Sequence, residues 1–320
     1  MNLLEILRSR VDDLSEGAHS PGLKAVLQHI DVAVKHLTRG QDSGDETAFT
    51  DAIYRTNQAF EGSLKEAYRV LAGRNPSNRT LQHIEDYLQA EGVLRSRVLD
   101  QFTSYRRNWR NSSTHDYWID FDEAEALLAI VTVSAFSIVL LDQISVRVAY
   151  ELAKISPSTV AATPASMSLV ERVALLAEAF AIEFGKNHNS KSTIRKAEAI
   201  GTLAGFLNSV DPHFDIQLEP KLAPDTSLRP DLLLGPPAER LIFEVKIARR
   251  FTEGRRLGLG GIEQISHYMK VGGMSQSILL ILTLGVEEAE RREISVEAGR
   301  IIVIGSPADG GPLPRPQRPR

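Results

Sequence analysis

The chain has 320 residues, of which 42% are hydrophobic and 24% charged, and its formal net charge at pH 7 is −4. This length suffices for two domains of ordinary size, and the composition is typical of a soluble globular protein. The slightly negative charge gives no general attraction to nucleic acid, so nucleic-acid contacts must come from local basic patches. The absence of cysteine excludes disulfides, thiolate zinc sites and a cysteine nucleophile, and it is compatible with a reducing cytosol.

No segment is expected to cross or enter a membrane. Residues 1–13 carry acidic and basic side chains too early for a secretory signal. The longest uncharged apolar stretch, 126–141, is shorter than the roughly 20 residues that span a bilayer. We therefore expect a buried helix there, a cytoplasmic location and no membrane partner.

The first half of the chain is predicted to be all helical. Within residues 1–155 the only prolines are Pro21 and Pro76, and apolar residues recur with a spacing near 3.6. Asp122, followed three residues later by Glu125, fits a capping box at the start of the last helix. Helices are expected over 2–16, 22–38, 46–72, 79–89, 91–110 and 122–153.

The second half is predicted to be an α/β domain with a mixed sheet. Its small, proline-punctuated beginning (156–168) is typical of a linker, and its Pro/Gly-rich end (307–320) is expected to be disordered. A helical stretch precedes several strand-like runs, and a helix interrupts those runs, which favours a compact α/β fold. The expected helical segments are 169–209, 261–272 and 286–298, and the expected strands are 214–218, 231–235, 240–248, 277–284 and 300–304.

Asp231, Glu244 and Lys246, on two neighbouring predicted strands, are the strongest candidate site. A short turn joins the strands, so we expect an antiparallel hairpin. Pairing of Leu234 with Leu241 then places Asp231 opposite Glu244. Because side chains alternate along a strand, Glu244 and Lys246 share one face, and the three charged groups converge at the open end of the hairpin.

This set suits a hard divalent cation such as Mg²⁺ or Mn²⁺. The carboxylates of Asp231 and Glu244 and the backbone carbonyl of Val245 supply oxygen ligands. Without a cation, burying two carboxylates together costs free energy through like-charge repulsion. A bound metal activates water and offsets charge on a phosphate, while Lys246 can orient that water or stabilise the transition state. These residues therefore predict a divalent-cation site.

The same residues resemble the PD-(D/E)XK nuclease superfamily. The match is a Pro-Asp pair ending at Asp231, twelve intervening residues and the triplet Glu244-Val245-Lys246. It covers about 168–306. The resemblance implies a restriction-endonuclease-like fold and a nuclease that acts on DNA.

Further residues extend this resemblance. Gln264 and Tyr268, one helical turn apart on one face, follow the lysine strand as in the RecB-like branch, where the pair supports the site and contacts nucleic acid. Family members also often place a carboxylate on the helix before the sheet. Glu198 is our candidate for that carboxylate, with Glu183 and Glu178 as alternatives.

Four arginines beyond the lysine strand are candidates for phosphate binding: Arg249, Arg250, Arg255 and Arg256. The alternative is that these arginines only form a solvated face. For the carboxylates, the alternative is an ordinary hairpin salt bridge. An earlier Pro-Asp pair ends at Asp225, but no apolar strand follows it, so a turn is the better interpretation.

A second motif, Arg110-Asn111-Ser-Ser-Thr-His115, lies between a predicted helix and the long closing helix. It resembles the R-N-x-x-x-H signature of HEPN domains, small helical bundles of prokaryotic RNases, over roughly residues 1–150. The resemblance implies metal-independent RNA cleavage, with His115 as general acid or base, Arg110 on the phosphate and Asn111 orienting the histidine or the substrate. It also implies a homodimer, because HEPN sites are usually shared between protomers.

Asp116 stands where HEPN proteins often have a small residue. The alternative interpretation is that Arg110 and Asn111 cap a helix end while His115 packs at a loop. Trp109 and Trp118 are expected to be core or interface anchors.

Together these patterns predict a two-domain prokaryotic protein: a HEPN-like bundle (1–155), the linker (156–168), a PD-(D/E)XK domain (169–306) and the tail (307–320). Coupling two such modules resembles antiphage or abortive-infection effectors. The main hypothesis is a Mg²⁺-dependent nuclease. One alternative is an RNase toxin that uses the HEPN site, with the second domain as a targeting module. The other is a non-catalytic dimerisation or sensing adaptor for a partner such as an ATPase.

Overall fold

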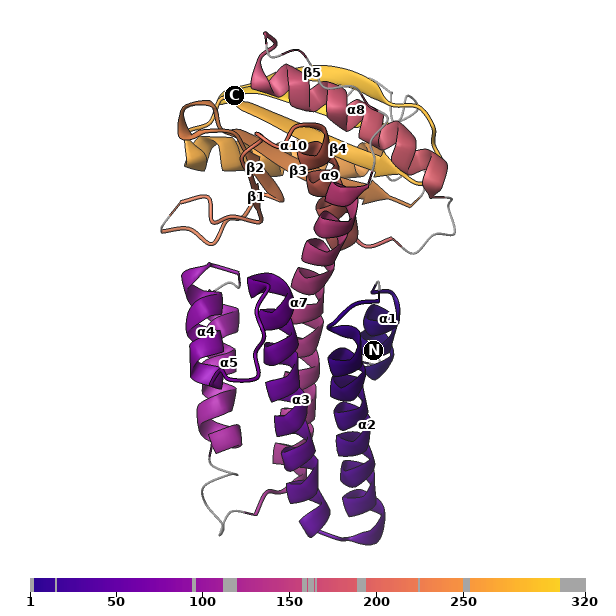
Figure 1. The fold of residues 1–320 in the computed structure, drawn as a ribbon, viewed down its shortest axis with the longest axis vertical. Coiled ribbons are helices and arrows are strands. Elements are labelled where there is room, and N and C mark those ends of the chain that lie inside the picture. The colour runs from indigo at the N-terminus through magenta and orange to yellow at the C-terminus, as the bar shows by residue number, and fades with distance from the viewer. Residues whose placement is uncertain are drawn as a thin grey trace, which may run out of the picture. The chain divides into compact units, whose positions relative to one another are not determined.

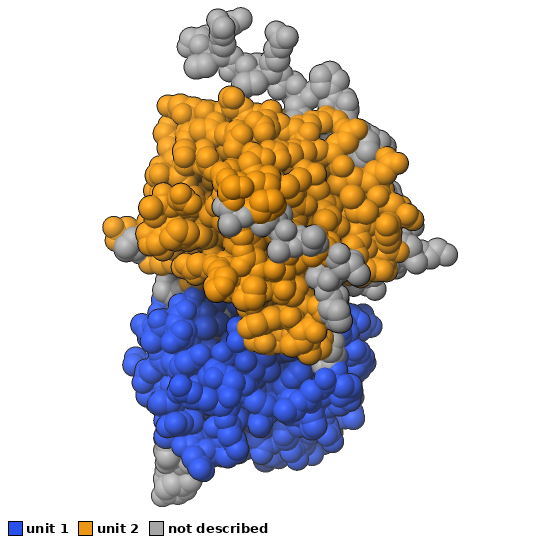
Figure 2. Space-filling view, turned by 45° about the horizontal axis from the view of Figure 1, so that its top comes forward, with its two compact units in different colours: residues 1–148 blue, residues 149–320 orange. Residues whose placement is uncertain are grey.

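The chain forms two compact units, residues 1–148 and 149–320, which Figure 2 colours separately. The computed structural model describes residues 3–14, 16–93, 96–111, 120–156, 160, 164, 166–188, 194–223, 225–249 and 254–305, without the side chains of 96–97 and 254–255. Within these residues the first unit is helical and the second contains a mixed sheet of six strands. The predicted change from helical to α/β structure is therefore confirmed. The linker residues 157–159, 161–163 and 165, and the tail from 306 onward, lie outside the described residues.

The helices of the first unit lie within or near the predicted ranges, with ends that differ by up to five residues (Figure 1). They are α1 (Leu3–Asp12), α2 (Ser20–Ser43), α3 (Thr47–Ala72), α4 (Leu81–Ala90), α5 (Ser96–Tyr105), the π-helical turn η1 (Arg106–Asn111) and α7 (Glu123–Ile155), whose last turns belong to the second unit. The predicted capping box is confirmed. The Glu125 N–H donates to Asp122 Oδ1 at 2.8 Å, and the Asp122 N–H donates to Glu125 Oε2 at 3.0 Å.

Aromatic side chains from several helices form the centre of the first unit. The rings of Phe102 and Phe136 lie 4.2 Å apart between centroids, and those of Phe60 and Tyr105 lie 4.8 Å apart. Trp109 stacks on Tyr105, as expected for a core anchor. Trp118 lies outside the described residues.

Helix α7 is only partly covered by the first unit. Ala126, Val133 and Ile144 are fully buried, whereas Leu127 and Leu128 are 49% and 55% exposed. Among the described residues α7 is the one helix long and apolar enough to span a bilayer, and half of its most apolar window is buried in the protein.

The second unit begins with helices and continues with strands, as predicted. Its elements are α8 (Leu169–Asn187), α9 (Lys196–Val210), β1 (Ile216–Leu218), β2 (Leu232–Leu234), the 3-10 turn η2 (Pro237–Glu239), β3 (Leu241–Ala248), α10 (Gly254–Gly272), β4 (Gln276–Thr283), β5 (Glu290–Val296) and β6 (Gly299–Gly305). The strand order is β1-β2-β3-β4-β6-β5. Strands β3, β4 and β6 are parallel, and the remaining pairs are antiparallel. Helix α10 packs on one face of the sheet and α8 on the other (Figure 1).

The predicted helix over 286–298 is wrong, because this segment forms the edge strand β5. Glutamate, arginine and alanine suggested a helix, yet Ile294 and Val296 alternate with polar residues and pack against the core under α10. Gly299, at φ 145°, follows β5 and begins β6, with which β5 pairs along its whole length. Sheet pairing thus overrides the local helical preference.

The β2–β3 hairpin has the predicted register. Leu234 pairs with Leu241 and Leu232 with Phe243, so Asp231 stands directly beyond the last pair, opposite Glu244. The connecting turn needs the left-handed backbone of Gly235, at φ 90°. Strand β2 pairs with only three residues of β3. From Glu244 onward, the edge of β3 that faces β2 is therefore not paired with β2.

Candidate active site

Asp231 and Glu244 lie side by side at this open edge, and both are buried. Their exposed fractions are 6% and 0%. The Asp231 N–H donates to Glu244 Oε1 at 3.2 Å, and Asp231 Oδ2 accepts the Val245 N–H at 2.8 Å. The aspartate thus takes over the hydrogen bond that a longer β2 would have made to β3. These bonds fix both carboxylates relative to the sheet.

The loop between β1 and β2 fixes the backbone of Asp231 from the other side. The Glu219 N–H donates to the Asp231 carbonyl at 2.9 Å, and Arg229 Nη1 donates to the Glu219 carbonyl at 2.8 Å. Glu219 adopts a left-handed backbone at φ 44°, which is strained for a residue with a side chain. The structure therefore holds the start of β2 in one position at some local cost.

Lys246 is held beside the carboxylates by residues of α10. Lys246 Nζ lies 3.6 Å from Glu244 Oε2 and donates to Gln264 Oε1 at 2.6 Å. Gln264 Nε2 in turn donates to the Tyr268 hydroxyl at 2.9 Å. The one-turn spacing of Gln264 and Tyr268 thus produces a direct contact, and the pair fixes the lysine. Gly261 allows the close approach of α10, because a Cβ there would come within 2.8 Å of Leu279.

The ionised form of Glu244 is destabilised in the metal-free protein. Burial, and then the charge of Asp231, raise the pKa of Glu244 to about 7, although Lys196 and Lys246 act in the opposite direction. Glu244 Oε2 is buried and accepts no hydrogen bond from the described residues. A carboxylate in this state is suited to bind a cation.

Lys196, the first residue of α9, is the member of this cluster that the sequence reasoning missed. Its Nζ lies 2.7 Å from Asp231 Oδ1 and 3.8 Å from Glu244 Oε2. Burial lowers the pKa of Lys196, but the charges of Asp231 and Glu244 together outweigh this effect, so its pKa is raised. One sequence signal existed, because a lysine in the first turn of a helix opposes the helix dipole.

Glu198 does not join Asp231 and Glu244. Among the described residues, no three acidic or histidine side chains come together as a metal-binding group. Glu198 lies two positions from Lys196 on α9, which places the two side chains about 200° apart around the helix. The Glu198 side chain is half-buried, whereas Lys196 is exposed. Of its rivals on α8, Glu178 is half-buried and Glu183 exposed.

The predicted phosphate-binding arginines are described only in part. Arg249, directly after β3, and Arg256, in the first turn of α10, are both exposed. Arg250 and the side chain of Arg255 lie outside the described residues. The two described arginines thus follow the strand that carries Glu244 and Lys246.

In the first unit the structure describes two residues of the second predicted site. Arg110 and Asn111 end the π-helical turn η1, where Arg110 Nη1 donates to Asn111 Oδ1 at 3.3 Å. Arg110 also lies 3.6 Å from Glu61 of α3. His115 and Asp116 lie outside the described residues.

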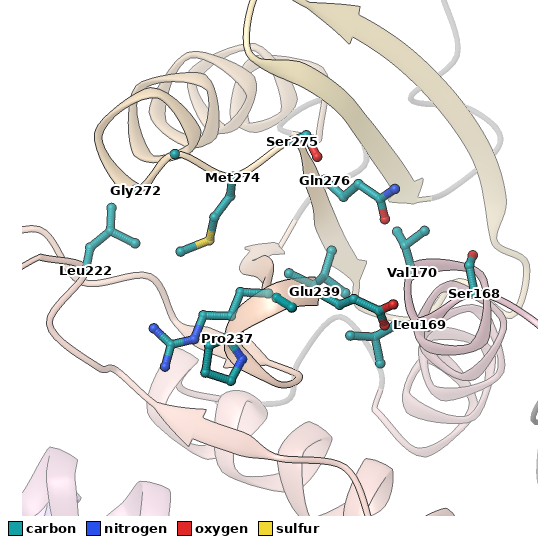
Figure 3. A pocket seen from close by; sticks show the side chains of 14 residues that line it. Ser168, Leu169, Val170, Leu222, Pro237, Glu239, Gly272, Met274, Ser275 and Gln276 are labelled. Atoms are coloured by element: carbon teal, nitrogen blue, oxygen red, sulfur yellow. The ribbon is translucent and has the colours of Figure 1, made fainter.

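A cavity of about 380 Å³ opens at the other end of the sheet, where β3 and β4 begin (Figure 3). Glu239 lies beside the first turn of α8, and Leu222 and Met274 line the opposite wall. None of the residues of the Asp231–Glu244 cluster lines this cavity. The cluster is therefore separate from this cavity.

No family model matches the chain, and no curated protein or solved structure matches it either.

Proposed function

We propose that the second unit is a metal-dependent nuclease of the PD-(D/E)XK kind, with DNA as its preferred substrate. One observation carries the proposal: two buried carboxylates, Asp231 and Glu244, are held in contact at an open sheet edge with the Lys246 ammonium beside them. An ordinary hairpin salt bridge would pair one acid with one base near the surface. Here two buried carboxylates share one site, and the pKa of Glu244 stays raised although two lysines lie beside it.

The residues present fit Mg²⁺ or Mn²⁺. Asp231, Glu244 and the Val245 carbonyl would supply hard oxygen ligands, with water completing the coordination. The Glu244 oxygen that accepts no hydrogen bond from the described residues is the group most in need of such an ion. When bound, the ion would activate water and offset charge on the phosphate.

The protein's own groups then have separate roles. Lys246, fixed by Gln264, is suited to hold the attacking water or to stabilise negative charge on the phosphate. Tyr268 acts through Gln264 as a positioning residue. Arg249 and Arg256, both exposed, are suited to bind the flanking phosphates.

A cleavage assay tests this proposal. Supercoiled plasmid and single-stranded DNA are incubated with the full chain in Mg²⁺ or Mn²⁺, in EDTA, and with Lys246→Ala. We expect cleavage in metal that is lost in EDTA and in the variant. Lys270→Ala, a change of an exposed lysine elsewhere in the unit, is the matched control and should cleave normally. Activity that survives both EDTA and Lys246→Ala would remove this site from consideration.

A metal-independent RNase in the first unit is the second candidate. The observation that favours it is the π-helical turn, because such turns are rare and frequent at functional sites, and Arg110 and Asn111 end this one. The proposal predicts RNA cleavage in EDTA that is lost in His115→Ala. RNA left intact by the wild-type chain under these conditions would argue against it.

A second copy of the chain is the proposed partner of the helical unit. Leu127, Leu128 and Val131 expose an apolar face on α7, which a homodimer could cover. Light scattering after gel filtration should give twice the chain mass, and Leu128→Glu should shift the protein towards a monomer. An unchanged dimer mass in that variant would exclude this face of α7 as the dimer interface.

A further inference from the structure

Lys196 stands where a divalent cation would bind. Its ammonium lies 2.7 Å from one oxygen of Asp231 and 3.8 Å from Glu244 Oε2, so it bridges the two carboxylates. Lys246 contacts only Glu244 among these acids and is anchored by Gln264. The two lysines therefore differ: Lys246 is fixed at the side of the pair, and Lys196 lies between its members.

The position of Lys196 is not explained by the stability of its helix. As the first residue of α9 it places a positive charge at the positive end of the helix dipole. Its side chain is 44% exposed, whereas that of Lys246 is 18% exposed. A flexible four-carbon stem that reaches in from the solvent-exposed side can swing out again without disturbing the core.

The charge balance of the cluster depends on which cation is present. When both acids are ionised, Asp231 and Glu244 contribute two negative charges and Lys196 and Lys246 two positive charges, so the metal-free cluster is then neutral. A divalent ion added to this set would leave two excess positive charges in a buried region. Departure of Lys196 removes one of them, and it also vacates the space between the carboxylates.

We propose that Lys196 is a resident counter-ion of the metal-free protein, which a divalent cation must displace before it can bind Asp231 and Glu244. This inference rests on the proposed metal-dependent function and adds a built-in competitor to it. The lysine keeps both carboxylates in place when no metal is present. It also lowers the apparent affinity for metal, because metal can bind only during the fraction of time in which the lysine has left the site.

Calcium binding to the full chain, measured by isothermal titration calorimetry, tests the competition. Lys196→Met and Lys196→Gln should bind Ca²⁺ about tenfold more tightly than wild type, as expected for a competitor that occupies the site roughly nine-tenths of the time. Lys270→Met, which removes an exposed lysine paired with Glu297, should bind as wild type does. Equal or weaker binding in both Lys196 variants would overturn the proposal.

A labelling experiment on wild type reports the displacement directly. Acetylation of Lys196 by an amine-reactive reagent, followed by peptide mass spectrometry, should be faster with Ca²⁺ than in EDTA, because the released amine faces solvent. Lys270 should be labelled equally in both conditions. Slower or unchanged labelling of Lys196 would contradict displacement.

Glu244→Gln separates failure of this inference from failure of the proposed function. If wild type and Glu244→Gln take up Ca²⁺ equally weakly, the metal site itself is absent and both proposals fail. If binding requires Glu244 but is insensitive to Lys196, only the displacement is wrong.

Discussion

The β2–β3 hairpin brings Asp231 and Glu244, separated by twelve residues in the sequence, into hydrogen-bond contact, whereas η1 keeps Arg110 beside its own neighbour Asn111. In the hairpin, each ladder pair fixes the next, so a short motif on two strands determines a spatial arrangement. In the helical unit, periodicity ends with the helix and fixes nothing about a histidine four residues further on. For this reason the motif on β2 and β3 predicts where its residues lie relative to each other, whereas the motif that begins at Arg110 does not.

We expect the largest effect from Lys246→Ala, which changes only the candidate site of the second unit. It removes an ammonium placed beside the carboxylates, so metal-dependent DNA cleavage should fall by about 10²-fold or more, as for loss of a group that stabilises the transition state. His115→Ala should leave this cleavage unchanged. Single-turnover rates on plasmid DNA measure both effects. Equal losses in the two variants would mean that the two regions do not act independently.

Loss of Gln264 should have a smaller effect of the same kind. Gln264→Ala leaves Lys246 in place but frees its ammonium, so the cleavage rate should fall about tenfold, while Tyr268→Phe, which only removes a partner of Gln264, should lower it less. The rates of the two variants with saturating Mg²⁺ measure this order. A larger loss in Tyr268→Phe than in Gln264→Ala would indicate that the tyrosine contacts the substrate itself.

The burial of Glu244 predicts a pH dependence of stability in metal-free protein. Its folded-state pKa of about 7 exceeds the ordinary value of 4.5, so the folded state binds the proton more tightly than the unfolded state does. Stability should therefore fall as pH rises from about 4.5 to 7. Glu244→Gln should melt a few degrees higher than wild type at pH 8 in EDTA and show little gain near pH 5. A melting temperature lowered by the variant at pH 8 would contradict a strained carboxylate.

Asp122→Ala is expected to have the smallest effect, and only on the helical unit. It breaks the capping box of α7 and should cost about 1 kcal/mol of stability. DNA cleavage at 25 °C should not change, because Asp122 lies in the other unit. Urea unfolding and the plasmid assay measure the two quantities. A parallel loss of cleavage would indicate that α7 transmits changes into the second unit.

The features that could be predicted from the sequence depend on local periodicity or on strand register. The capping box at Asp122, the pairing of Leu234 with Leu241 and the contact of Gln264 with Tyr268 all follow from fixed spacings. The edge strand β5 could not be predicted in this way, because its pairing with β6 opposes the preference of its own residues for helix.

The contact of Lys196 with the carboxylates could not be predicted either, because it depends on tertiary packing. Its contact with Asp231 depends on where α9 docks against the sheet, and helix periodicity alone gives only the face of a residue. The choice of Glu198 followed the residue type expected from family resemblance. Among the described residues, no group of three acidic or histidine side chains forms around Asp231 and Glu244, and the residue of α9 that contacts them is Lys196.

A crystal soaked in Mn²⁺ and measured at the manganese absorption edge tests the central claim most directly. We predict an anomalous peak beside the carboxylates of Asp231 and Glu244, with the Lys196 side chain moved out of the space between them. Mn²⁺ bound elsewhere, with Lys196 still bridging the two carboxylates, would contradict the account.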